Sequence, residues 1–183
     1  MRERPDGQLV AAAREGDAES FVELYRRYYP AAVGIAYSTL SDRHLAEDAA
    51  QEAFAIACRD LRRLRRGDKF AHWLNAICRK VACRLMKWKS QSGLPENLLS
   101  TANQADADAE SREDRARLVR QAMHRLSASA REIVVLRYFS GLTHEQISRV
   151  LGISDRAVYS RLCRARRKMA DFLRHNGVGR REP

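Results

Sequence analysis

The chain of 183 residues has a formal net charge of +11, with 45% hydrophobic and 31% charged residues, a composition typical of globular proteins. No uninterrupted apolar run approaches the roughly 18 residues of a membrane-spanning helix, and residues 1–20 lack the apolar core of a secretory signal. We therefore expect a cytoplasmic protein without a membrane segment. The positive charge favours a polyanionic partner, above all nucleic acid, because Lys and Arg side chains on phosphates release condensed counterions.

Apolar residues recur at helical spacing along most of the chain, and alternating strand-like stretches are nearly absent, which predicts an all-α protein. Asp17 is a suitable N-cap for the first long helix, and Pro30 predicts a kink or a new helix start within it. The next elements expected in chain order are a helix over residues 44–64, a turn over 65–69 and a helix over 70–89.

The helix over 44–64 carries an acidic polar stripe. Asp48, Gln51 and Glu52 have i, i+3, i+4 spacing and share one side, while the opposite side is apolar. In the next helix, aromatic and apolar residues are interleaved with cations. The aromatic and apolar residues are Phe70, Trp73, Leu74, Ile77 and Trp88, and the cations are Arg79, Lys80, Arg84, Lys87 and Lys89. Such a mixture suits unpaired DNA, because a ring stacks on a base while a cation binds its phosphate. The alternative for Phe70 and Trp73 is a place in the core.

Residues 90–114 have a different composition, rich in Ser, Gly, Pro, Asn, Gln and Ala, with six acidic residues against one basic residue, Arg112. Low apolar content leaves such a segment unable to offset its own ordering entropy. We expect a flexible acidic linker between two small helical domains, residues 1–89 and 115–174, each with a core of its own. Residues 175–183 form a basic tail.

The second domain has the helix-capping and helix-terminating residues of a helix-turn-helix. Gly141 can stop one helix, Thr143 and Gln146 form a capping box, Gly152 ends the next helix after about two turns, and Ser154 caps the last. The second helix of such a motif enters the major groove of DNA. Its groove-facing residues are predicted to be Asp155, Arg156, Tyr159, Ser160, Cys163 and Arg164, with Arg161, Arg166, Arg167 and Lys168 available for phosphates.

The four cysteines, Cys58, Cys78, Cys83 and Cys163, form no CxxC pair, and we interpret them as reduced, small, buried residues. A zinc site from His72, Cys78 and Cys83 is disfavoured because five-residue spacing on a helix splays the two thiols. Carboxylate clusters with metal-ligand spacing, glycine-rich phosphate loops and nucleophile motifs are absent from the sequence. We expect neither enzymatic activity nor a cofactor.

Four segments in this order resemble the extracytoplasmic-function (ECF) group of bacterial sigma-70 factors: GDAESFVELYRRYY, AEDAAQEAF, LRRGDKFAHWLNAI and LSASAREIVVLRYFSGLTHEQISRVLGISDRAVYSRLCRARRKM. The resemblance implies that the two domains are sigma regions 2 and 4. It also implies a transcription initiation factor that binds core RNA polymerase, directs it to promoter DNA and helps to separate the strands. An anti-sigma factor is a further implied partner.

The resemblance implies three sets of site residues. Asp48, Gln51 and Glu52 match the segment that docks on the clamp of the largest polymerase subunit. The residues that match the minus-10 reader are Arg66, Asp68, Lys69, Phe70, Trp73 and Lys80. Those that match the minus-35 reader are Arg156, Tyr159, Ser160, Arg161, Cys163 and Arg164.

Three positions depart from the family pattern. Lys80 stands where the family often has Asn, Arg84 where it has Asp or Asn, and Tyr159 where a cation is common. Because one bidentate guanine contact contributes about 1 to 3 kcal/mol, the change at Tyr159 predicts an altered minus-35 preference. The alternative function is a stand-alone helix-turn-helix regulator whose N-terminal helices dimerise.

Overall fold

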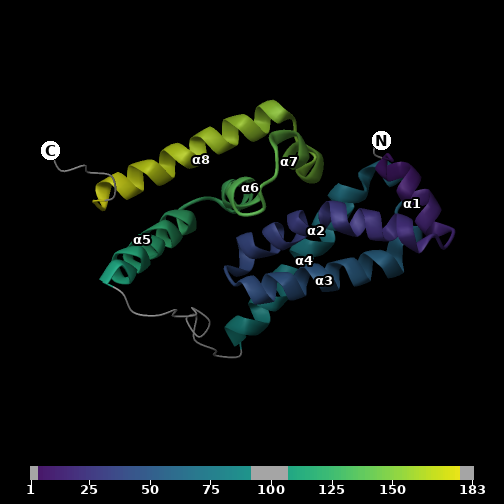
Figure 1. Cartoon of the computed structure of the whole chain (residues 1–183), viewed down its shortest axis with the longest axis horizontal. Coiled ribbons are helices and arrows are strands. Elements are labelled where there is room, and N and C mark those ends of the chain that lie inside the picture. The colour runs from purple at the N-terminus through teal and green to yellow at the C-terminus, as the bar shows by residue number, and fades with distance from the viewer. Residues whose placement is uncertain (1–3, 92–106, 178–183) are drawn as a thin grey trace.

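A computed structural model describes residues 4–91 and 107–177, and all regular secondary structure in these ranges is helical, which confirms the all-α prediction (Figure 1). The elements are α1 (Asp6–Arg14), α2 (Ala18–Leu40), α3 (Arg43–Asp60), the 3-10 turns η1 (Leu61–Arg63) and η2 (Gly67–Lys69), α4 (Phe70–Gln91), α5 (Ala107–His124), α6 (Ala128–Tyr138), α7 (His144–Leu151) and α8 (Asp155–His175). None of the described helices is long and apolar enough to cross a membrane.

The predicted capping residues define the ends of α2 and α3. The side chain of Asp17 accepts hydrogen bonds from the backbone N–H groups at the start of α2, at 3.0 and 3.3 Å. Ser41 ends α2 in the left-handed region with a φ of 52°, and Asp42 caps α3. Pro30 lies inside α2, which continues as a single helix, so Pro30 does not start a new helix.

The N-terminal unit is built on the contacts among α2, α3 and α4. The inner side of α3 consists of small residues that are fully buried: Ala46, Ala49, Ala50, Ala53 and Ala57. Small side chains allow neighbouring helices to approach closely, since interaxial distance depends on the residues at the contact. The acidic stripe on the other side of α3 is thereby turned outward.

Helix α1 was not among the expected elements. It buries only two apolar residues, Leu9 and Val10, and has no side-chain N-cap, so its sequence signal is weak. Contacts with α2 hold it in place: Arg27 donates to Asp6 at 2.6 Å, and the hydroxyl of Tyr28 also donates to Asp6. Burial raises the pKa of Tyr28, which keeps this hydroxyl a donor.

Helix α5 starts at Ala107, inside the range expected to be linker. The central part of the predicted linker, residues 92–106, lies outside the described residues, as do residues 178–183 of the predicted basic tail.

The C-terminal unit contains the predicted helix-turn-helix, α7 and α8. Thr143 and Gln146 form the capping box, with bonds of 3.2 and 2.8 Å, and Ser154 caps α8. Gly141 and Gly152 adopt left-handed φ values of 69° and 66° between the helices, which favours glycine at both turns. These local predictions are confirmed.

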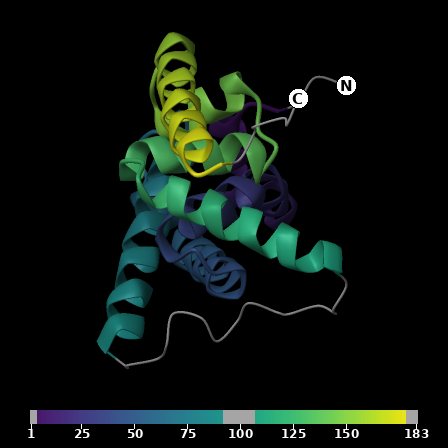
Figure 2. The same ribbon diagram turned by 90° about the vertical axis from the view of Figure 1, so that its left-hand side faces the viewer.

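The two units do not have separate cores, contrary to the expectation from the sequence. Helix α2 packs on α6, α4 packs on α7, and the buried residues of both units form one continuous cluster. Figures 1 and 2 both show α6 between the N-terminal helices and α8.

The prediction that all four cysteines are buried is wrong for Cys58, Cys83 and Cys163, which are exposed. Each lies on a helix, where successive residues are turned by about 100°, so neighbours of buried residues face outward. Cys78 alone is buried, with its thiol 3.1 Å from the carbonyl oxygen of Ala32, and burial raises its pKa to about 12.

Candidate polymerase- and DNA-binding surfaces

The acidic stripe lies on the outer side of α3. Asp48 and Gln51 are exposed and Glu52 is half-buried, whereas Ala49 and Phe54 behind them are buried. Asp48 and Gln51 are thus accessible to a partner protein, on a helix held from behind by apolar packing.

Glu52 already forms an ion pair with another residue of the chain. Nη2 of Arg84, on α4, lies 2.5 Å from both carboxylate oxygens of Glu52. The side chains of Arg84 and Glu52 are 59% and 39% exposed, so water screens this ion pair. Sequence reasoning singled out Arg84 as a departure but missed its partner, because the two residues are 32 positions apart on different helices.

The predicted minus-10 residues lie at the start of α4 and in the turn before it. Arg66 and Asp68 are exposed and form an ion pair of 2.8 Å, and Lys69 lies 3.9 Å from the same carboxylate. The hydrogen bond from Arg66 lowers the pKa of Asp68, which therefore stays ionised near neutral pH. Lys80 is exposed and Trp73 is half-buried.

Phe70 does not belong to this exposed surface. Its side chain is fully buried, with its ring centroid 5.7 Å from that of Tyr28 and 6.2 Å from that of Trp73. The core alternative considered for Phe70 therefore holds in the structure, and its contact with Trp73 supports the partly exposed indole.

The predicted minus-35 residues share one side of α8. Arg156, Tyr159, Ser160, Cys163 and Arg164 are exposed and Arg161 is half-buried. The opposite side of α8 packs through buried apolar residues, Val158, Leu162 and Ala165.

Tyr159 has a neighbour that sequence reasoning missed. Its ring stands edge-on to that of His144, at the start of α7, with centroids 6.3 Å apart. Helical spacing within α8 gives no sign of this contact, because it depends on the crossing of α7 and α8. The pair places two aromatic rings at the N-terminal end of α8.

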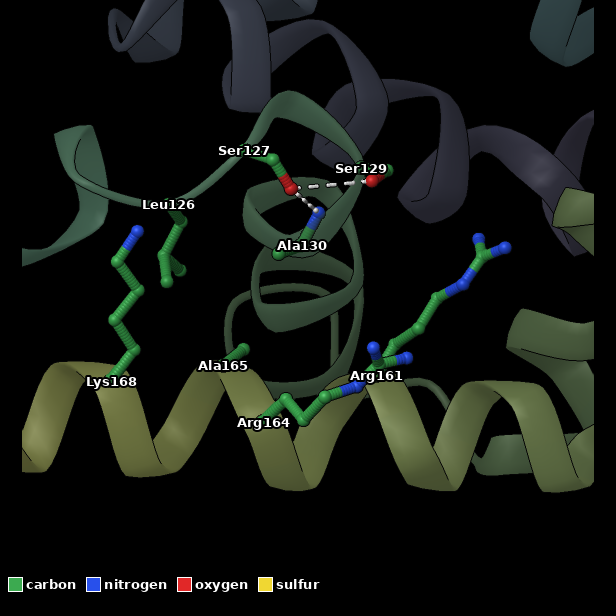
Figure 3. Close-up of a pocket in the computed structure, with 8 residues that line it drawn as sticks. All are labelled: Leu126, Ser127, Ser129, Ala130, Arg161, Arg164, Ala165 and Lys168. Carbon is green, nitrogen blue, oxygen red and sulfur yellow. Dashed lines mark hydrogen bonds between the residues drawn. The ribbon is translucent and has the colours of Figure 1, made fainter.

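A hollow of about 370 Å³ lies between α8 and the start of α6 (Figure 3). Its cations are Arg161, Arg164 and Lys168, and Ser127, the N-cap of α6, accepts a hydrogen bond from the N–H of Ala130 at 3.4 Å. A helix N-terminus and three cations produce a positive potential. This side of α8 therefore suits contact with a DNA backbone.

Two family descriptions match the two units: "Sigma-70 region 2" matches residues 24–91 and "Sigma-70, region 4" matches residues 116–169. The ECF RNA polymerase sigma factor SigM of Mycobacterium tuberculosis is 31% identical over 97% of this chain and 89% of its own length. The chain belongs to the ECF subfamily of the sigma-70 family. This ECF sigma factor is thus an RNA polymerase subunit of the class that recognises promoters in transcription initiation.

Further comparisons agree with this assignment. The RNA polymerase sigma factor NccH of Alcaligenes xylosoxydans xylosoxydans is 28% identical to the ECF sigma factor over 94% of this chain and 97% of its own. The structure of CnrH in complex with the cytosolic domain of CnrY matches with a TM-score of 0.62 and 25% identity, over 95% of this chain and 100% of that chain. The structure of RpoE from Bartonella quintana, in complex with the anti-sigma factor NepR, has a TM-score of 0.52 and 21% identity, over 86% of this chain and 98% of that chain, and shows the shared fold.

Proposed function

We propose that this ECF sigma factor binds core RNA polymerase through Asp48, Gln51 and Glu52, on the outer side of α3. The observation that carries this proposal is an accessible acidic stripe on a protein whose net charge is +11. DNA repels carboxylates, so the stripe suits a basic protein surface, and the resemblance to the family assigns that surface to the clamp of the largest polymerase subunit.

In the same proposal, Arg66, Asp68, Lys69, Trp73 and Lys80 capture the unpaired minus-10 strand. Exposed cations lie beside a half-exposed indole, an arrangement that lets a base stack on the ring while its phosphate meets a cation. Phe70 acts indirectly, by supporting Trp73 from the core.

The minus-35 element is read from the exposed side of α8. Arg156 and Arg164 are the proposed readers of base edges, since arginine binds guanine in a bidentate manner. Tyr159, Ser160 and Cys163 complete the set that faces the groove, and Arg161 faces the backbone.

We further propose that the protein is cytoplasmic, is not an enzyme and is controlled by an anti-sigma partner. Support for the partner comes from the related CnrH and RpoE, whose structures were determined with the cytosolic domain of CnrY and with the anti-sigma factor NepR. The competing function is a stand-alone helix-turn-helix regulator, which would need no polymerase contact on α3.

The test compares the wild-type protein with the double variant Asp48→Arg, Glu52→Arg in pull-downs with core polymerase and in runoff transcription. We expect the wild type to bind core and give specific transcripts, and the variant to lose both while keeping its helical circular dichroism. A wild-type protein that does not bind core would favour the stand-alone regulator. Unchanged binding of the variant would show that the polymerase contact does not lie on α3.

A further inference from the structure

The N-terminal helix α1 lies against the loop that joins α3 to α4, residues 61–69. Gly67 of this loop approaches α1 so closely that a Cβ atom at Gly67 would be 3.0 Å from Cα of Gly7 and 3.2 Å from Cβ of Val10. Two carbon atoms in optimal contact are about 3.5 to 4.0 Å apart. A side chain at position 67 would therefore push the loop away from α1.

A hydrogen bond joins α1 to the other end of the loop. Arg14, in the last turn of α1, donates from Nε to the carbonyl oxygen of Leu61 at 3.2 Å. Leu61 is the first residue of η1, and its side chain is buried. Helix α1 thus contacts the loop at its start, through Arg14, and near its end, through the backbone of Gly7.

Helix α1 is in turn fixed to α2. Arg27 and Tyr28 both donate to Asp6, whose side chain is only 10% exposed. A helix of nine residues is marginally stable in water by itself, so its place depends on these bonds and on the burial of Leu9 and Val10. The loop is therefore supported by an element that is anchored to the core.

We propose that α1 is a positioning element for minus-10 reading, which holds the loop in the conformation that captures the unpaired strand; the inference rests on the proposed function. Gly67 lies between Arg66 and Asp68, two exposed residues that we assign to that strand, so a displacement at Gly67 moves both. The loop contains two 3-10 turns, whose hydrogen-bond geometry is poorer than that of an α-helix. A loop that is already held in place does not have to be ordered when DNA binds, and this strengthens binding.

Two variants disturb the contact at opposite ends of the loop. Gly67→Ala places a methyl group against α1, and Arg14→Ala removes the hydrogen bond to Leu61. Gly7→Ala is the matched control, because it adds the same methyl group on the other side of the contact. Its Cβ atom would be 3.8 Å from the backbone nitrogen of Asp68, an ordinary van der Waals distance.

Two affinities are measured for each variant: that of the sigma factor for core polymerase, and that of the assembled holoenzyme for a labelled single strand. The strand is the non-template minus-10 strand of a promoter whose transcript start has been mapped with the wild type. We expect Gly67→Ala and Arg14→Ala to weaken strand binding about fivefold or more, and Gly7→Ala to change it less than about twofold. Affinity for core should stay within about twofold in all three variants, because the outer side of α3 is not part of the contact.

Unchanged strand binding in Gly67→Ala and Arg14→Ala would overturn the proposed role of α1. A loss of core affinity as large as the loss of strand affinity would also overturn it, since that result indicates general destabilisation of the fold. If the wild-type holoenzyme binds the strand no better than a strand of scrambled sequence, the proposed minus-10 function fails instead.

Hydrogen exchange of the free sigma factor reports on the loop directly. The N–H groups of Leu64 and Lys69 donate within the loop, to the carbonyl oxygens of Leu61 and Arg66, at 3.2 and 3.0 Å. We expect Arg14→Ala to make these two amides exchange about threefold faster or more, while amides in the middle of α8 keep their rates. Equal rates in the wild type and Arg14→Ala would show that the loop keeps its conformation without this contact to α1.

Discussion

Substitution of Arg84 by alanine would free a carboxylate that we assign to polymerase binding. In the free protein Arg84 Nη2 lies 2.5 Å from both oxygens of Glu52. An ion pair of this exposure contributes about 0.2 to 1 kcal/mol. If Glu52 must leave Arg84 to contact polymerase, binding includes the free-energy cost of breaking this ion pair. Arg84→Ala removes that cost, and we expect the affinity for core to rise by up to about fivefold.

The measurement is competition binding of labelled sigma factor to core polymerase at low and high salt. Because the Debye length falls from about 10 Å at 0.1 M to about 3 Å at 1 M, we expect the gain to shrink at high salt. Arg43→Ala is the matched control, since Arg43 pairs at 3.0 Å with Glu47, a carboxylate of the same helix that is not part of the stripe.

A double-mutant cycle separates the ion pair from the general loss of one positive charge. In a Glu52→Gln background, we expect Arg84→Ala to have no effect on the affinity for core. Equal or weaker binding of Arg84→Ala in the wild-type background would refute the reasoning, as would a gain of the same size in the Glu52→Gln background.

Three further predictions concern the core, the thiols and the recognition helix. Phe70→Ala should lower the free energy of unfolding by about 3 to 5 kcal/mol in urea denaturation, because the ring is fully buried; a loss below about 1 kcal/mol would contradict this. At pH 8, iodoacetamide should modify the three exposed cysteines and spare Cys78 until urea is added, because its pKa of about 12 leaves almost no thiolate. Arg164→Ala should weaken binding to the preferred minus-35 sequence by about 1 to 3 kcal/mol and altered sequences less, whereas equal loss on all sequences, as expected for Arg166→Ala, would identify a phosphate contact.

Local features of the fold were predictable because their causes lie within a few residues. An N-cap such as Asp17 or Thr143 acts on backbone N–H groups two or three positions away, and Gly152 ends α7 through its own φ. The sidedness of α3 and α8 follows equally from helical periodicity, which is why the stripe and the recognition side were predicted correctly as outward faces.

The burial of individual side chains depended on tertiary contacts between different helices. Periodicity alone did not separate Phe70, which is buried, from Trp73, which is half exposed. It did not predict α1, whose two buried residues make a weak pattern, or the exposure of Cys58. In each of these, burial is set by the neighbouring helix and not by the residue itself.

The amino-acid sequence by itself determined the helices, their caps, the helix-turn-helix and the family, because these depend on local order along the chain. Only the tertiary structure decided that the two units dock, with Arg79 on Glu132 and Asn75 on Val150. Those partners are 53 and 75 positions apart, and their pairing depends on the shapes and charges of two complete surfaces. No spacing rule within one helix contains that information.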